Sequence, residues 1–116
     1  MTEEQLLNMI TELSKEMGMD PDDLLELYET FIEEMTADLF KLKIAYQKGD
    51  FIELKNVSHN IKGVSASLKF EEMFIESKAL NDKLKSDLVD NLYPHIDAMT
   101  KAFSSFKLAF TAYHNH

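Results

Sequence analysis

The sequence predicts an all-α protein: an antiparallel up-and-down four-helix bundle with one additional short helix at the N-terminus. Apolar residues recur three and four positions apart over long stretches, which is the spacing of one face of an α-helix. Only three glycines and two prolines occur among 116 residues, so little in the chain would interrupt long helices. The connections between these stretches are short, which makes successive helices antiparallel neighbours. We therefore expect a single domain over residues 1–116.

The additional helix is expected over residues 2–17. Thr2 is followed three residues later by Gln5, which is the spacing of a capping box at the start of a helix. Apolar residues then recur at helical spacing until Gly18, and glycine is a typical helix stop. We expect this helix to cover the bundle as a lid.

The four-helix bundle is expected over residues 20–113. Asp20 and Asp50 are placed to cap its first two helices, and Gly49 separates the two. The residues expected on the inner faces are Leu24, Tyr28, Phe31, Met35, Leu39, Leu42 and Tyr46 in the first helix, Leu54, Val57, Ile61, Ser65 and Leu68 in the second, Met73, Ser77, Leu80 and Leu84 in the third, and Leu88, Leu92, Ile96, Met99, Phe103, Phe106 and Phe110 in the last.

The last helix has two candidate starting points. Ser86 is a candidate N-cap, and a start there would include Leu88 in the apolar stripe. Pro94 would then lie inside the helix, where a proline removes a hydrogen bond and introduces a kink. A start near Tyr93 avoids the kink, because proline is tolerated in the first turn.

The composition excludes several kinds of partner. The formal net charge is −9, and all twelve basic residues are lysine, so the guanidinium groups that bind phosphates and bases are absent. Nucleic-acid binding is therefore not expected. No stretch approaches the roughly 18 consecutive apolar residues that span a bilayer, and the start lacks the order of a signal peptide. We expect a cytoplasmic monomer that does not bind membranes.

The sequence also gives no indication of a metal site. Without cysteine, neither a disulfide nor a thiolate zinc site can form. His114 and His116 lie two residues apart, but they lack further ligands nearby in the sequence. We therefore expect no bound metal.

His59 lies on the outer face of the helix that follows Asp50. At about 100° per residue it falls nearly opposite the centre of the apolar arc, so it is not a core histidine. Gly63 follows one turn later; glycine costs about 1 kcal/mol of helix stability relative to alanine, and its missing side chain leaves space beside the imidazole. This predicts that something bulky approaches there. The outer-face neighbours are Ile52, Lys55, Asn56, Lys62, Gly63 and Ala66, of which Ile52 and Ala66 offer an apolar rim for a protein partner.

Three lysines follow one edge of this face. Lys55, Lys62 and Lys69 are seven residues apart, which favours an anion beside the imidazole. A neutral imidazole is one of the few side chains that act as nucleophiles near pH 7, so the combination indicates a phosphoryl acceptor. From geometry alone, a simple surface histidine and a tolerated glycine remain an equal alternative.

The run from His59 to Leu68, HNIKGVSASL, resembles the signature of histidine-phosphotransfer domains, in which lysine and glycine follow the histidine after one turn and serine and leucine come next. The resemblance extends over nearly the whole chain, from the helix end at residues 15–18 to the region of Leu80. It implies a four-helix bundle with the phosphoryl group on Nε2 of His59. It further implies that Lys62 assists phosphoryl transfer electrostatically and that Gly63 gives a partner access to His59. Ser65 is part of the signature.

The resemblance also suggests how the ring is oriented. Family members often set a polar residue of the following helix against the other ring nitrogen, and Asn81 matches that position. Asn81 would accept a hydrogen bond from Nδ1–H, with Ser77 and Lys78 as alternatives. One residue departs from the family pattern: Lys69 stands where a glycine usually follows the leucine. Lysine does not readily adopt the left-handed conformation, so we expect a differently built turn there.

The partners implied by the resemblance are the receiver domains of response regulators, with a hybrid sensor histidine kinase as a further candidate. Ile52, Asn56 and Ala66 would form the docking surface. The receiver is expected to supply Mg²⁺. This chain is expected to have no cofactor and no ATP site of its own, so we expect a phosphoryl carrier and not an enzyme. Two alternatives stay open: the phosphorylation domain of a chemotaxis-type kinase, and a non-catalytic helical adaptor.

Overall fold

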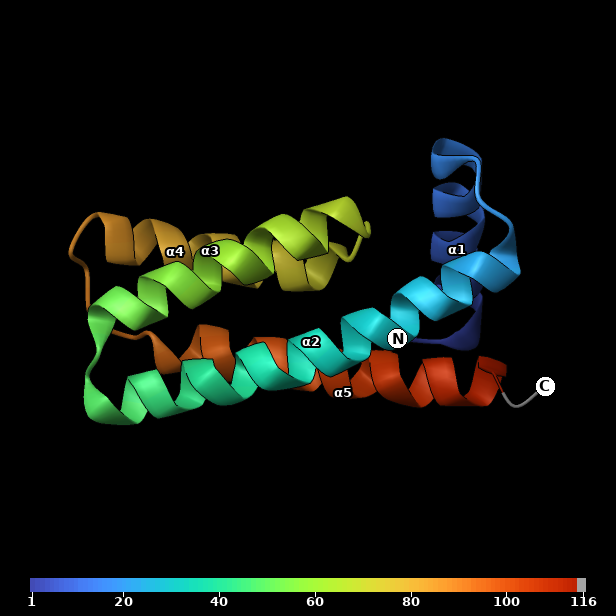
Figure 1. Cartoon of the computed structure of the whole chain (residues 1–116). Coiled ribbons are helices and arrows are strands. Elements are labelled where there is room, and N and C mark those ends of the chain that lie inside the picture. Colours follow the sequence, from blue (N-terminus) through green and yellow to red (C-terminus); the bar gives the residue numbers. More distant parts are fainter. Residues whose placement is uncertain (115–116) are drawn as a thin grey trace.

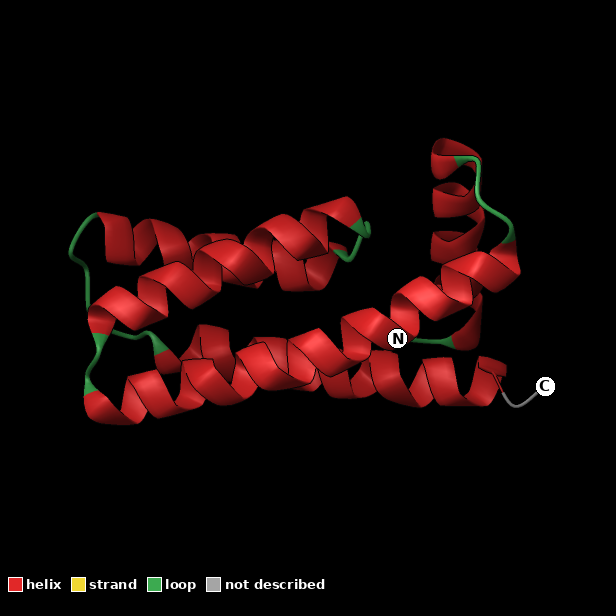
Figure 2. Cartoon of the chain, in the orientation of Figure 1, coloured by secondary structure: helices red, strands yellow, loops and turns green. Residues whose placement is uncertain are grey.

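The computed structural model describes residues 1–114. This range contains five helices, joined by loops, and no strand (Figures 1 and 2). His116 lies outside this range. The prediction of an all-α protein is confirmed. No helix among the described residues is both long and apolar enough to cross a membrane. The helices are α1 (Glu3–Met17), α2 (Pro21–Lys48), α3 (Phe51–Ser67), α4 (Glu71–Lys85) and α5 (Tyr93–His114).

Helices α2 to α5 form the predicted up-and-down bundle. Each contacts its two neighbours, with α2 against α3 and α5, and α4 against α3 and α5. The first and last helices of the bundle, α2 with 28 residues and α5 with 22, are longer than α3 with 17 and α4 with 15. In Figure 1 the ends of α2 and α5 project beyond the turn between α3 and α4, and α1 stands across these projecting ends. Leu6, Ile10 and Leu13 of α1 are buried there, so α1 is the lid that the sequence predicted.

Side-chain caps define the starts of the first three helices. The hydroxyl of Thr2 accepts a hydrogen bond from the backbone N–H of Gln5 (3.1 Å), and Gln5 Oε1 accepts one from the backbone N–H of Thr2 (2.8 Å). Carboxylate oxygens of Asp20 and Asp50 likewise accept N–H bonds at the starts of α2 and α3. These bonds satisfy donors that a helix start would otherwise leave unpaired, and they confirm the predicted starts.

The last helix begins at Tyr93, with Pro94 in its first turn, so the alternative start at Ser86 is wrong. Ser86 instead ends α4. As a result Leu88 lies in the connecting loop and is 58% exposed, whereas the sequence pattern placed it in the core. Tyr46 is also more exposed than predicted, at 40%, because its ring packs at the surface against that of Tyr93 (centroids 5.5 Å apart).

The turn between α3 and α4 corrects the prediction for Lys69. This residue adopts the left-handed conformation (φ 59°), in spite of its side chain. The backbone N–H of Lys69 donates to the carbonyl of Ala66 (3.2 Å), and that of Phe70 donates to the carbonyl of Ser65 (2.9 Å), which is the Schellman pattern. Phe70 is fully buried, and Lys69 pairs with Glu16 of α1 (3.2 Å). The burial of Phe70 and the two backbone hydrogen bonds offset the strain of the left-handed conformation at Lys69, which a glycine in this position would have avoided.

Aromatic rings fill the bundle centre, and one of them carries an unpaired polar group. The ring of Tyr28 packs against Phe106 and Phe110, with centroids 5.7 and 6.3 Å apart. Its hydroxyl is buried without a hydrogen-bond partner. Burial raises the pKa of this phenol well above its ordinary value, so the group stays neutral.

Replacing Tyr28 by phenylalanine should therefore stabilise the protein. The substitution removes a buried hydroxyl that lacks a partner and keeps the ring contacts, so we expect the free energy of unfolding to rise by about 1 kcal/mol. Urea unfolding of Tyr28→Phe measures this. Tyr113→Phe is the control, because that residue is only partly buried; a Tyr28→Phe variant less stable than wild type would contradict the prediction.

Candidate functional site

His59 lies at the middle of α3, as the ninth of seventeen residues, and its side chain is exposed. The opposite face of the helix is buried through Leu54, Ile61 and other residues, and α3 packs against α2 and α4. The predicted orientation of this helix is therefore confirmed. Of the residues predicted beside His59, five are exposed, namely Ile52, Lys55, Asn56, Gly63 and Ala66, and Lys62 is partly buried.

The imidazole of His59 differs from the other two described histidines. Nδ1 of His95 lies 2.8 Å from a carboxylate oxygen of Glu76. His114 lies 3.7 Å from Glu29 and stacks on a phenylalanine ring. Within residues 1–114, His59 has no hydrogen bond or ion pair, so both of its ring nitrogens remain available.

Open space surrounds the helix beside His59. A Cβ added at Gly63 would meet no atom within 4 Å, apart from the backbone of its own helix turn and its chain neighbours. Packing inside the protein therefore does not require glycine here, although glycine costs about 1 kcal/mol in the middle of a helix. The position is consistent with a requirement imposed by something that approaches from outside.

Two of the three predicted lysines lie along α3. Lys55 and Lys62 are helical, but α3 ends at Ser67, and Lys69 lies in the following turn with its ammonium against Glu16. The prediction that three lysines form a row on this helix is wrong for Lys69. Residues seven apart share a helix face only while the helix continues, and α3 ends before Lys69. Lys62 is one turn from His59, which is the position from which an ammonium can act on a group bound to the imidazole.

An ionised carboxylate on α4 lies within electrostatic range of Lys62. The hydrogen bond from Lys78 to Asp82 (2.8 Å) is the main cause that lowers the pKa of the Asp82 carboxyl, and the charges of Lys85 and Lys62 lower it further. Asp82 therefore stays negative around neutral pH. Three lysines, Lys62, Lys78 and Lys85, therefore act on this one carboxylate.

The hydrogen bond expected between Asn81 and His59 is not present. Asn81 is fully buried, and its amide nitrogen donates to the backbone carbonyl of Lys55 (2.9 Å) and to the hydroxyl of Ser58 (3.1 Å). Its short side chain reaches the inner side of α3, whereas the imidazole lies on the outer side. Ser77, one of the alternatives, bonds within its own helix. The sequence pattern did not single out Ser58 as a partner of Asn81. The one indication of its burial is its position next to the apolar arc of the helix.

Three further residues singled out from the sequence, Ser77, Lys78 and Ser65, also make no contact with the imidazole of His59. Lys78 bonds to Asp82, so neither it nor Ser77 reaches the ring. Ser65 is fully buried on the core side of α3, and its hydroxyl has no partner. It therefore belongs to the packing of α3 and not to the exposed surface.

Comparison with known families identifies the chain. The model of a family described as Hpt domain matches residues 26–107, which covers most of α2, all of α3 and α4, and most of α5. The chain belongs to the Hpt domain family. Searches of curated proteins and of solved structures gave no match. Membership gives this Hpt domain a histidine-phosphotransfer role in phosphorelays, and α1 lies outside the matched range.

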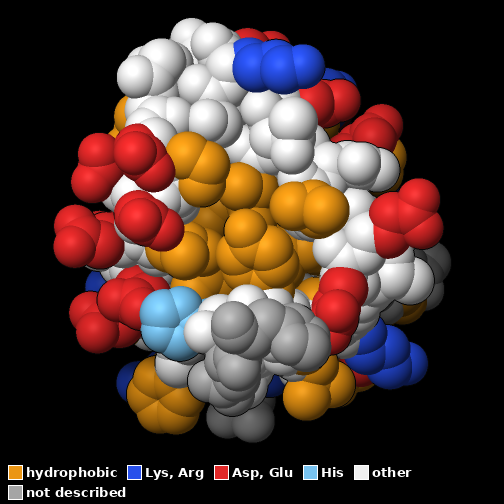
Figure 3. All heavy atoms as spheres, turned by 90° about the vertical axis from the view of Figure 1, so that its right-hand side faces the viewer, with side chains coloured by type: hydrophobic (Ala, Val, Ile, Leu, Met, Phe, Trp, Pro, Cys, Tyr) orange, Lys and Arg blue, Asp and Glu red, His pale blue; other side chains and the backbone are white. Residues whose placement is uncertain are grey.

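The charge of this Hpt domain is distributed unevenly. Residues 1–34 contain eleven aspartates and glutamates and only one lysine. Residues 35–116 contain ten aspartates and glutamates and eleven lysines. The excess negative charge therefore belongs to α1 and the first half of α2. Figure 3, which views the α1 end of the molecule, shows acidic side chains around an apolar area. The surface around His59 belongs to the electrically balanced part, which suits an anionic phosphoryl group better.

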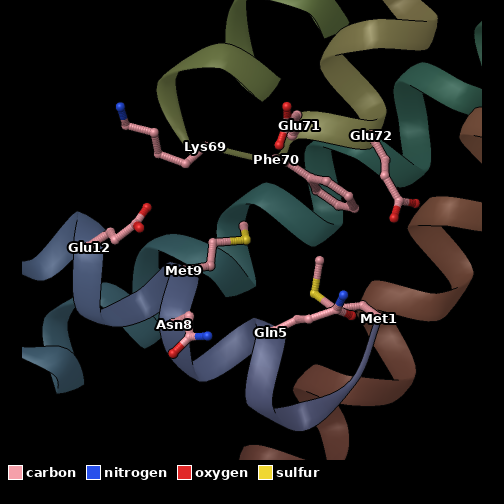
Figure 4. A pocket seen from close by; sticks show the side chains of 9 residues that line it. All are labelled: Met1, Gln5, Asn8, Met9, Glu12, Lys69, Phe70, Glu71 and Glu72. Atoms are coloured by element: carbon pink, nitrogen blue, oxygen red, sulfur yellow. The ribbon is translucent and has the colours of Figure 1, made fainter.

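A hollow beneath α1 lies apart from this surface. Figure 4 shows it between α1 and the turn that joins α3 to α4. Its volume is about 260 Å³. Its lining contains no histidine, so it does not contain the phosphoryl acceptor. The lining residues are Met1, Gln5, Asn8, Met9, Glu12, Lys69, Phe70, Glu71 and Glu72.

His59→Gln should leave the fold intact. An exposed side chain without partners contributes little, so we expect the free energy of unfolding to change by less than about 0.5 kcal/mol. His95→Gln is the matched control, because it removes a partly buried contact with Glu76 and should cost about 1 kcal/mol. Urea unfolding compares the two; a larger loss for His59→Gln would mean that His59 supports the core.

Proposed function

We propose that His59 Nε2 carries a phosphoryl group between the aspartates of response-regulator receiver domains. The observation that supports this is the state of its imidazole, which lies on an open helix face with both nitrogens free of partners in residues 1–114. A phosphoryl acceptor needs such a lone pair and an unobstructed approach along it. Family membership supports the histidine-based chemistry, and the geometry favours this histidine over His95 and His114.

In the proposed transfer, the lone pair of Nε2 forms a bond to phosphorus as the bond between phosphorus and the aspartate oxygen breaks. The electron pair of the broken bond leaves with the aspartate, which becomes a carboxylate. The neutral imidazole attacks with its proton on Nδ1, so the phosphorylated ring is first a cation. The reverse reaction loads the aspartate of a second receiver.

This carrier needs little catalytic machinery of its own. Phosphoryl transfer has a loose transition state that depends on positioning and on balancing charge. We expect Lys62, one turn from His59, to balance negative charge on the transferred group, and the receiver to supply Mg²⁺. None of the three glycines stands in a phosphate-binding loop pattern, so we do not expect phosphorylation directly from ATP.

The receiver is proposed to dock on the exposed face of α3. Ile52, which is 77% exposed, and Ala66 provide apolar contact on either side of His59, and Asn56 provides a polar one. Gly63 allows the partner to approach the backbone closely. A hybrid sensor histidine kinase could present its receiver to the same face. We propose that the domain acts as a cytoplasmic monomer.

Transfer of labelled phosphate tests this proposal. Purified protein is mixed with a panel of phosphorylated receiver domains, and ATP alone is the control. We expect labelling of the wild type, His95→Gln and His114→Gln, and none of His59→Gln. Labelled His59→Gln would contradict the assignment. Labelling only by a kinase catalytic domain with ATP would favour the chemotaxis-type domain, and no labelling by any donor would favour the adaptor.

Gly63 gives a second prediction, in which stability and transfer change in opposite directions. Both Gly63→Ala and Gly63→Gln should raise the free energy of unfolding by about 0.5–1 kcal/mol, because glycine is a poor helix former and the space is open. Only the glutamine should obstruct docking, and we expect it to slow transfer by about tenfold or more. Transfer by Gly63→Gln at the wild-type rate would show that the glycine does not serve access.

A further inference from the structure

A buried polar cluster lies between α3 and α4 beneath His59. It consists of the side chains of Asn81 and Ser58 and the backbone carbonyl of Lys55, and we call it the Asn81 cluster. The Asn81 amide donates to the carbonyl (2.9 Å) and to the Ser58 hydroxyl (3.1 Å), and the hydroxyl donates to the same carbonyl (3.1 Å). Both side chains are fully buried.

The cluster acts on the turn of α3 that carries His59. Ser58 directly precedes His59, and the carbonyl of Lys55 is the regular acceptor for the His59 backbone N–H in an α-helix. The side chain of Asn81 therefore binds the same oxygen as the backbone of the acceptor histidine. Among the described residues, the two bonds donated by Asn81 are the only hydrogen bonds between α3 and α4.

Stability does not explain the asparagine. Its carbonyl oxygen Oδ1 is buried without a hydrogen-bond partner, and an unpaired buried oxygen is unfavourable. An apolar residue of similar volume would pack at this position without that penalty. Apolar contacts between helices tolerate small shifts and rotations, whereas directed hydrogen bonds define one relative position. The amide thus gives the pair of helices a fixed register at the level of His59.

We propose that Asn81 is a positioning residue, which fixes the His59 turn of α3 against α4 through the backbone and leaves the imidazole free to orient on a docked receiver. Charged neighbours on α4 do not replace it, because Lys78 and Asp82 pair with each other at the surface. The inference rests on the proposed function for its consequence in transfer. The positioning itself is a property of the unphosphorylated protein.

Asn81→Leu tests the proposal, with Ser77→Ala as the matched control. Ser77 is equally buried on α4, but its hydroxyl bonds only to carbonyls of its own helix. Hydrogen exchange of the His59 amide reports the cluster without any phosphate. We expect exchange in Asn81→Leu to be about tenfold faster than in wild type and Ser77→Ala, although its global stability is equal or higher. Ser58→Ala, which keeps the bond from Asn81 to the carbonyl, should show a smaller change.

Two phosphate donors separate positioning from chemistry at the ring. Transfer from a phosphorylated receiver that labels the wild type should be about tenfold slower in Asn81→Leu, whereas labelling by potassium phosphoramidate should change by less than about twofold. Slower phosphoramidate labelling would mean that Asn81 acts on the imidazole itself, and would overturn the proposal.

Equal exchange and equal transfer in Asn81→Leu and Ser77→Ala would also overturn it. If Asn81→Leu does not fold, Asn81→Ala and Ser58→Ala provide the same comparison. A wild type that no receiver labels, together with fast His59 exchange in Asn81→Leu, would reject the proposed function and retain the positioning role.

Discussion

The burial of one face of α3 against α2 and α4 is the constraint on which the site depends. Leu54 and Ile61 have no exposed surface, and they lie on the side of the helix opposite His59. Because a helix has a fixed rotation per residue, burying this face leaves the histidine on the opposite, open one. The polar bonds from Asn81 add a fixed register to this hydrophobic orientation. The imidazole of His59, the proposed phosphoryl acceptor, then needs no contact with the rest of the protein.

This arrangement suits a carrier that meets its partners one after another. A ring locked by internal bonds would be oriented for one approach, whereas a free ring on a fixed backbone can adjust to the two receivers of the proposed function. The uneven charge suits the same proposed role. Carboxylates are concentrated in residues 1–34, so His59 lies in the part of the sequence that carries little net charge. The lid α1 covers the projecting ends of α2 and α5 and lies outside the family match.

Much of the fold was predictable, because local signals decide it. Capping residues such as Asp50 and the helical spacing of apolar residues gave the starts, the inner faces and the exposure of His59. The errors arose where a tertiary effect overrides a local one. At Lys69, backbone hydrogen bonds and the burial of Phe70 compensate for a conformation that lysine disfavours alone. The role of Asn81 depends on the distance between two helices, which spacing along the chain does not contain.

In this arrangement the chain fixes the backbone of His59 and leaves its imidazole free. Nuclear magnetic resonance of ¹⁵N-labelled imidazole in the unphosphorylated protein measures whether the ring is free. We expect the two neutral tautomers to exchange rapidly, and neither ring N–H to be protected from solvent. A single tautomer with a protected Nδ1–H would contradict a free imidazole, because it would show that a group of the protein already holds the ring.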